Sequence, residues 1–272
     1  MTNGGKGKRK RFDRHARPFV VDRFAGTEPY YADYRPPYPK TAVQDVVELF
    51  GLDGTGRVLD LGCGTGRLAV AFGPHAGDVV GMDPNPVMLN HARERAADTE
   101  VANVTFVEGS DADIGQRDLK PLRLTTIGRA FHWMDREHTL TRLHGMTESG
   151  GGVVLFDDDE WLTRGTADWQ DAVYEVVGSF VDDLPERTGP MAYEETWADV
   201  LRTSPFSAVE TRRYDVVREW SAAEVVGYVL SLSFCTPELV GDTDAFEREL
   251  RNRLGTGPLV QRATVKTKLA RR

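Results

Sequence analysis

A glycine-rich turn at the end of an apolar run is the feature of this sequence with the clearest chemistry. Residues 58–61 read Val-Leu-Asp-Leu, as a buried strand does, and glycines follow at positions 62, 64 and 66. Glycine adopts positive φ freely and has no Cβ, so such a turn lets a ligand approach bare backbone amides. A helix that starts near Arg67 would point its first N–H groups at the same space. The pattern therefore predicts a strand, a turn and a helix that cradle a nucleotide.

The spacing of the glycines separates two classes of nucleotide site. A dinucleotide-binding turn has the pattern G-x-G-x-x-G, but here Arg67 stands where its third glycine belongs. A second strand, predicted over residues 78–82, runs into Asp83, whose carboxylate can bind two ribose hydroxyls. The alternative is that Asp83 only accepts N–H groups at the start of the next helix. Because the acid follows a glycine turn, ribose binding is the favoured interpretation.

These features together resemble the class I S-adenosylmethionine-dependent methyltransferases, whose first motif is written D-x-G-x-G-x-G. The matching residues are Asp60, Gly62, Gly64 and Gly66. Residues 109–111 resemble the adenine loop of the family, although Asp111 and Ala112 stand where many relatives carry alanine and then glutamate. Two further segments, 30–39 and 129–133, are similar to one small-molecule branch of the family. The resemblance covers roughly residues 24–160 and implies S-adenosylmethionine as the cofactor.

The resemblance also implies which residues bind that cofactor. They are Tyr31, Arg35, Asp60, Gly62, Cys63, Gly64, Gly66, Asp83, Pro84, Met88, Ser110, Asp111, Ala130 and Phe131. The resemblance implies that Ser110 and Asp111 face the adenine and that Arg35 pairs with the carboxylate of the cofactor. The alternatives are that Arg35 is a surface arginine beside a proline-stiffened segment, and that Tyr31 and Tyr34 pack as ordinary aromatic residues.

His132 follows the predicted fourth strand, residues 122–127, at the edge where ligands of open α/β sheets bind. It is the candidate proton acceptor of the reaction, and the alternative is that it lines the pocket together with Trp133. His132, His138 and His144 are six residues apart. On a helix each would point about 240° away from the last, so we expect no metal site.

An acidic run, residues 157–160, follows the predicted fifth strand at 152–156 and precedes Trp161. Such a run is commonly a solvated charged face, but at this edge of the sheet it could hold a cationic substrate. The residues expected to contact the substrate are His132, Trp133, Asp157, Asp158, Asp159 and Trp161.

Charge is distributed unevenly along the 272 residues. The net charge is −8, yet residues 1–17 carry seven basic residues and one acidic residue, which leaves −14 for the rest. An acidic body disfavours nucleic-acid binding, and the basic segment 1–23 is expected to be a flexible tail rather than an RNA-binding arm. Two cysteines make no disulfide framework, and no apolar stretch is long enough to span a bilayer. We expect a cytoplasmic monomer or homodimer whose partner is a small molecule, not nucleic acid or membrane.

Apolar runs that alternate with helical patterns between residues 58 and 156 predict βαβ units and a parallel sheet. Strands over 208–217 and 260–269 would close it, as in the family, into a Rossmann-like α/β fold: a seven-stranded mixed sheet in the order 3-2-1-4-5-7-6 with helices on both faces. Further helices are expected over 85–96, 166–181, 193–201, 221–234 and 244–254. The expected domains are the tail, 1–23, a cofactor-binding core, 24–160, a helical cap, 161–205, and the rest of the core with the closing strands, 206–272.

The expected function is methyl transfer to an amine or hydroxyl of a small polar metabolite. The acidic body and the acidic run favour a cation, so N-methylation of an amino sugar in antibiotic biosynthesis is the first candidate. Two alternatives stay open: carboxyl O-methylation of a small organic acid, and a regulator that binds the cofactor without turnover.

Overall fold

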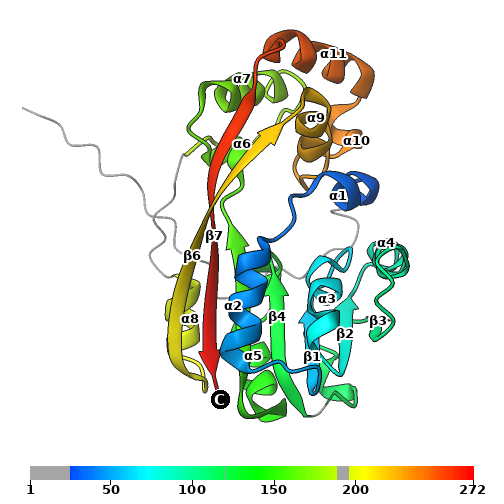
Figure 1. The fold of residues 1–272 in the computed structure, drawn as a ribbon. Coiled ribbons are helices and arrows are strands. Elements are labelled where there is room, and N and C mark those ends of the chain that lie inside the picture. The colour runs from blue at the N-terminus through cyan, green and yellow to red at the C-terminus, as the bar shows by residue number, and fades with distance from the viewer. Residues whose placement is uncertain (1–24, 120, 189–195) are drawn as a thin grey trace, which may run out of the picture.

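A seven-stranded sheet in the order β3-β2-β1-β4-β5-β7-β6 forms the centre of the molecule (Figure 1). The computed structural model describes residues 25–119, 121–188 and 196–272, so the predicted tail lies outside the described residues. The strands are β1 Arg57–Leu61, β2 Asp78–Asp83, β3 Val104–Glu108, β4 Leu122–Gly128, β5 Thr147–Asp158, β6 Ser207–Trp220 and β7 Leu259–Arg271. Neighbours from β3 to β5 are parallel, and β7 is antiparallel to β5 and β6. The strand order confirms the predicted fold.

Helices cover both faces of this sheet. The helices beside it are α2 Lys40–Phe50, α3 Arg67–Phe72, α4 Pro86–Asp98, α5 Arg136–Met146 and α8 Trp197–Arg202. Side chains alternate between the faces of a strand, so Val58 and Val154 join the core under α2, α3 and α4. Leu59 and Val153, one residue away, join the core under α5 and α8. Both faces are therefore buried, as a parallel sheet requires.

A second group of helices stands at one end of the sheet, at the top of Figure 1. We call it the helical layer; it consists of α1 Glu28–Tyr34, α6 Trp161–Arg164, α7 Asp168–Val177, α9 Ala222–Leu230, α10 Pro237–Val240 and α11 Thr243–Leu254. These helices share one apolar core that includes Trp161, Val173, Val229 and Phe246. The strands β6 and β7, of 14 and 13 residues, extend beyond the shorter parallel strands and carry the layer.

The helical layer draws on more of the chain than the predicted cap of residues 161–205. The helices between β6 and β7 join α6 and α7 because their apolar faces bury one another. The helix α8, inside the predicted cap segment, packs instead against the sheet, where Leu201 is fully buried with Phe206. The boundaries of the domains stay a prediction.

Local signals placed the helix starts correctly where a side chain caps the helix. Ser221 and Glu224 form a capping box at the start of α9, and Asn85 accepts N–H groups from the first turn of α4. The start of the fifth strand was predicted five residues late. Residues 149–151 lie within β5 at an irregularity of its pairing with β4, with Gly150 at a φ of 80°.

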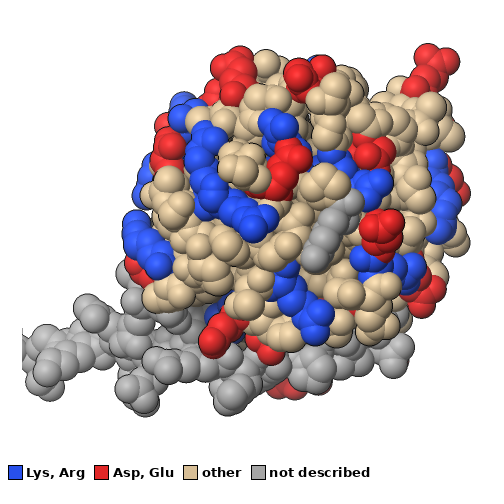
Figure 2. All heavy atoms as spheres, turned by 90° about the horizontal axis from the view of Figure 1, so that it is seen from below, with Lys and Arg blue, Asp and Glu red and all other residues tan. Residues whose placement is uncertain are grey.

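Figure 2 views the molecule from the end opposite the helical layer. Lys and Arg side chains on this face lie among Asp, Glu and uncharged residues, rather than in one continuous basic band. No helix within the described parts of the chain is both long enough and apolar enough to cross a membrane.

Candidate functional site

The glycine turn between β1 and α3 is held tightly against the sheet. Gly62, Gly64 and Gly66 have φ values of 71°, 51° and 74°, the left-handed region that glycine favours. A Cβ on Gly62 would lie 2.6 Å from the Cβ of Ala130. A Cβ on Gly64 would meet only Tyr31, at 3.8 Å. Gly62 thus permits close packing of the turn, whereas Gly64 faces open space beneath Tyr31.

Asp60 fixes the start of the turn from inside the molecule. One carboxylate oxygen accepts the N–H of Ala69 in α3 at 2.9 Å, and the other accepts the hydroxyl of Thr126 in β4 at 2.9 Å. Asp60 is 1% exposed, and this burial raises its pKa to about 7. The residue therefore joins β1, α3 and β4 and lies behind the turn.

Asp83 holds the turn from the end of β2. Its carboxylate accepts the N–H of Gly64 at 2.8 Å and the N–H of Asn85 at 2.9 Å. Burial raises its pKa to about 6. The structure thus contains the alternative considered for Asp83, a bond to backbone at the start of α4. Each carboxylate oxygen can accept a second bond, so ribose binding by Asp83 stays a prediction.

Two polar atoms beside the turn are buried without a hydrogen-bond partner among the described residues: the hydroxyl of Thr65 and Nε of Arg67. Arg67 donates through Nη2 to the carbonyl of Ala32 at 2.6 Å, and burial lowers its pKa to about 10. A small cavity of about 20 Å³ lies here, lined by both residues, by Gly62 and by Tyr31. Unsatisfied buried donors are rare in native proteins, so this space, which has room for about one water molecule, favours an acceptor atom.

The loop predicted to face adenine, residues 109–111, directly follows β3. Ser110 donates to the carboxylate of Asp113 at 2.9 Å. Asp111 accepts the N–H of Asp135 at 3.0 Å and the hydroxyl of Thr139 at 3.1 Å. The Asp111 side chain therefore ties this loop to α5. Among the other predicted cofactor residues, Met88 and Phe131 are buried, Pro84 is half-buried, and Cys63 is buried in the turn.

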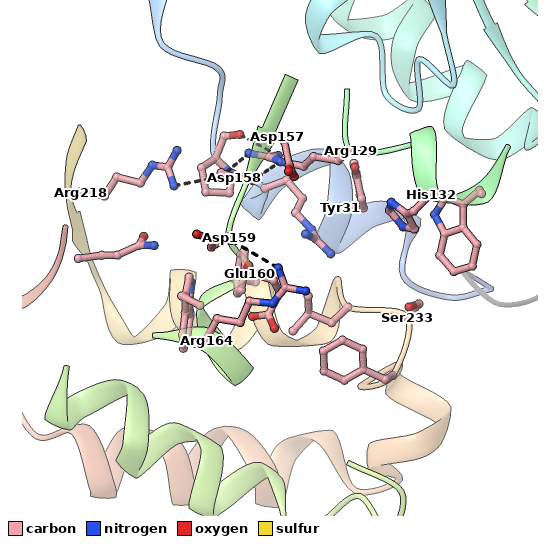
Figure 3. A pocket seen from close by; sticks show the side chains of 18 of the residues that line it. Tyr31, Arg129, His132, Asp157, Asp158, Asp159, Glu160, Arg164, Arg218 and Ser233 are labelled. Carbon is pink, nitrogen blue, oxygen red and sulfur yellow. Dashed lines mark hydrogen bonds and ion pairs between the residues drawn. The ribbon is translucent and has the colours of Figure 1, made fainter. Parts of the chain in front are cut away.

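The main cavity, of about 390 Å³, lies between the carboxyl ends of β4 and β5 and the helical layer (Figure 3). Its lining includes every predicted substrate residue: His132, Trp133, Asp157, Asp158, Asp159 and Trp161. Tyr31 and Arg129 line both this cavity and the small cavity at the glycine turn. The two spaces therefore adjoin, and Tyr31 and Arg129 stand between them.

Each carboxylate of the acidic run has a partner from this chain. Asp157 pairs with Lys268 at 3.2 Å, and Asp159 pairs with Arg164 and Lys266, each at 3.4 Å. Glu160 accepts N–H groups at the start of α6. The run is neither a solvated face nor a set of free carboxylates.

Asp158 binds two arginines that the sequence reasoning missed. Arg129 donates to both of its oxygens, at 2.6 and 2.8 Å, and Arg218 lies 3.5 Å from one of them. Burial opposes the ionisation of Asp158, but the charge of Arg129 holds its pKa below the ordinary value. Arg129 has a φ of 55°, unusual outside glycine, and this turns its side chain from the end of β4 toward β5. No spacing rule links Arg129 with Arg218, because they lie far apart in the sequence.

His132 lies in the short 3₁₀-helix Phe131–Trp133, directly after β4. It lines the main cavity, and its ring lies 4.6 Å from the ring of Trp133. Desolvation of the imidazole lowers the pKa of His132 to about 4, and the positive charges of Arg164 and Arg136 act in the same direction. The imidazole is therefore neutral near pH 7 and is a weak base.

Arg35 lies in an aromatic slot of the main cavity. Its guanidinium is 4.8 Å from the ring centre of Tyr31 and 5.1 Å from that of Tyr228, and Nη2 donates to the carbonyl of Ser231 at 3.0 Å. Its Nε is buried without a partner among the described residues. Arg35 is thus not a free surface arginine, and its predicted contact with the cofactor carboxylate stays a prediction.

Comparison with known proteins places these features in context. Residues 58–151 match the family described as a methyltransferase domain. An uncharacterised methyltransferase of Mycobacterium tuberculosis is 26% identical over 206 residues, which cover 75% of this chain and 74% of that protein. A probable S-adenosylmethionine-dependent methyltransferase of Saccharomyces cerevisiae is 25% identical over 129 residues, 47% of this chain and 44% of that protein. The solved structure of a candidate type II methyltransferase from Anaeromyxobacter dehalogenans, 20% identical, shares the fold with a TM-score of 0.60, covering 87% of this chain and 97% of that one.

Proposed function

This chain is a class I S-adenosylmethionine-dependent methyltransferase, and we propose that it methylates a small molecule bound in the main cavity. The observation that carries the proposal is the junction of the two cavities at Tyr31 and Arg129. A ligand on the glycine turn and a second ligand under the helical layer would meet there. A volume of about 390 Å³ is within the range of small-molecule sites.

The residues around the turn fit the cofactor of this family. Gly64 leaves space beside Tyr31, and the unpartnered donors on Thr65 and Arg67 suit a carboxylate. We assign the ribose to Asp83 and the adenine to the segment around Ser110, Asp111, Ala130 and Phe131. When bound, S-adenosylmethionine supplies a methyl group on a sulfonium sulfur, which the lone pair of an acceptor takes by in-line displacement while the electron pair of the broken S–C bond stays on sulfur.

The chain then has to position the acceptor and exclude water, which is worth about 7–11 kcal/mol of the barrier when the geometry is productive. The helical layer closes the cavity over the ends of β4 and β5 and so serves this purpose. We place His132 and Trp133 in the wall of the acceptor site. A base with a pKa of about 4 is a poor proton acceptor for an ammonium or an alcohol.

Charge in the cavity favours an acidic acceptor over a cationic one. Three of the four carboxylates of residues 157–160 are paired with five basic side chains, Arg129, Arg164, Arg218, Lys266 and Lys268. The fourth, Glu160, accepts N–H groups of α6, and Arg35 adds a further cation to the cavity. In the cavity lining, four arginines stand against four carboxylates, and each of these carboxylates already has a partner, so a protonated amino sugar would find no free carboxylate. An ionised carboxylate has no proton to lose and needs no base. We therefore prefer the second of the predicted substrates, a small organic acid, to the first, an amino sugar.

Transfer of label from methyl-labelled S-adenosylmethionine to panels of organic acids, phenols and amino sugars tests the proposal. We expect product with an organic acid. The Gly64→Val variant should lose cofactor binding, because its side chain enters the space beneath Tyr31. Gly54→Val is the matched control, since Gly54 also has positive φ, 87°, but nothing within 4 Å. Cofactor binding without transfer to any acceptor would favour a regulator, and equal loss in both glycine variants would remove the assigned cofactor position.

A further inference from the structure

At one end of the main cavity, two buried hydrogen-bond donors lack an acceptor. They are Nε1 of Trp161, in α6, and Nη2 of Arg218, in β6, and neither has a partner in the described ranges of the chain. Trp161 is 2% exposed. Leaving such groups unpaired costs about 1–3 kcal/mol each, so two of them in one cavity point to a ligand that supplies acceptors.

The register of β6 and β7 adds a third donor beside them. Arg218 is directly opposite Gln261, so the two side chains are neighbours on one face of the antiparallel pair. Gln261 accepts the indole N–H of Trp220 through Oε1 at 3.0 Å, which fixes the amide and leaves its NH₂ group as a donor. The ring of Trp220 lies 5.8 Å from that of Trp161. The three donors thus belong to one cluster of side chains.

Arg218 also carries a charge that its neighbours only partly balance. Its contact with Asp158 is 3.5 Å long, whereas Arg129 makes two shorter bonds to the same carboxylate. Asp158 is therefore already neutralised by Arg129. The side chain of Arg218 is 16% exposed, which limits the screening of its charge by water. A group of donors around a cation of this kind recognises an anion.

The shape of the cavity indicates what else the ligand carries. Figure 3 shows Arg218 and His132 on opposite sides of the cavity, with the acidic run and Arg164 between them. Leu232 and Phe234 also line the space, so an apolar or aromatic body fits there. The end near Tyr31 and His132 adjoins the glycine turn.

We propose that Arg218, Trp161 and Gln261 form an anion site that anchors a carboxylate of the substrate. The substrate is then an organic acid with two carboxylates on an apolar body, held by one carboxylate so that the other, the methyl acceptor, reaches the end near Tyr31. This inference rests on the proposed function for its role in catalysis, but the anion site itself does not depend on methyl transfer.

Benzoate and benzamide test the site, because they have nearly the same shape and differ in charge. Their affinities are measured by titration calorimetry on the full-length chain saturated with S-adenosylhomocysteine. We expect benzoate to bind at least about tenfold more tightly than benzamide, as a charge-assisted bond worth about 1.4 kcal/mol requires. Arg218→Gln should lower the affinity for benzoate at least about tenfold and leave the affinity for benzamide unchanged. Trp161→Phe, which removes the indole N–H, should lower the affinity for benzoate by a few fold.

Arg213→Gln is the matched control, because Arg213 is an exposed arginine on the same strand. It should leave benzoate affinity unchanged. Arg218→Gln should still fold, since Asp158 keeps both bonds to Arg129, and an unchanged near-ultraviolet circular dichroism spectrum checks this. Equal affinities for benzoate and benzamide, no benzoate binding at millimolar concentration, or full benzoate affinity in Arg218→Gln would each overturn the anion site. If S-adenosylhomocysteine fails to bind, the proposed function fails, and benzoate titration of the chain alone still decides the anion site.

Discussion

Arg129 and Asp158 join the carboxyl ends of β4 and β5 through two parallel hydrogen bonds, of 2.6 and 2.8 Å. Both side chains are only 11% exposed. The Arg129 guanidinium also lies 4.8 Å from the ring centre of Tyr38. Both residues line the main cavity, and Arg129 also lines the small cavity at the glycine turn, so the pair lies where the two cavities adjoin.

Asp158→Asn should destabilise the fold by about 3 kcal/mol, because removal of one partner leaves the buried charge of Arg129 uncompensated. Urea unfolding measures the change. Asp159→Asn is the control; Asp159 is 43% exposed, and the loss of such an ion pair costs at most about 1 kcal/mol. Similar losses of unfolding free energy in the two variants would contradict the idea that the buried pair of Arg129 and Asp158 stabilises the fold.

The titration of Asp60 should lower the free energy of unfolding as the pH rises from about 5 to 7. Its folded pKa is about 7 and its ordinary value is 3.8, so the folded state holds a proton that the unfolded state has released. The stability from this group is complete below pH 4 and is lost as the pH rises toward 7, with a slope of about 1.4 kcal/mol per pH unit. Urea unfolding gives the free energy of unfolding at pH 5 and at pH 7. The difference between the two values should be smaller in Asp60→Asn than in the wild type. The exposed Asp53→Asn should keep the wild-type difference, and an unchanged difference in Asp60→Asn would contradict the raised pKa.

His132→Ala should lower kcat by only a few fold, because a neutral imidazole with a pKa of about 4 transfers protons poorly at pH 7. Turnover of the best acceptor from the panel measures the effect. The exposed His138→Ala, in α5, serves as the control. A loss of about 100-fold or more, confined to His132→Ala, would restore the role of proton acceptor.

Asp83→Asn should weaken the cofactor at least about tenfold in calorimetry, since one carboxylate oxygen that can accept a ribose hydroxyl is replaced by a donor. Asp78→Asn, at the opposite end of β2, should have no effect on affinity. Asp83 also accepts the N–H of Gly64, so the variant can lose stability as well as cofactor contact. Its thermal unfolding midpoint without cofactor is therefore measured to separate the two effects. Full affinity in Asp83→Asn would remove the ribose assignment.

The sequence by itself determined the glycine turn and the parallel part of the sheet, and its resemblance to a known family supplied the strand order and the cofactor. These features depend on local rules: Gly62, Gly64 and Gly66 need positive φ, and short apolar runs separated by helices need a parallel sheet. The positions of His132 and Trp161 beside the cavity also followed, because both come directly after strands of known direction.

Only the tertiary structure decided which partners the carboxylates of residues 157–160 have. Residues 157–160 read as an acidic run, but the register of β7 places Lys266 and Lys268 beside it, and β6 supplies Arg218. These cations lie more than 50 residues from the carboxylates that they neutralise, and no local pattern relates them. Because electrostatic interaction depends on distance in space and on burial, the acidic run that suggested a cationic substrate is neutralised in the fold, and we propose an anionic substrate instead.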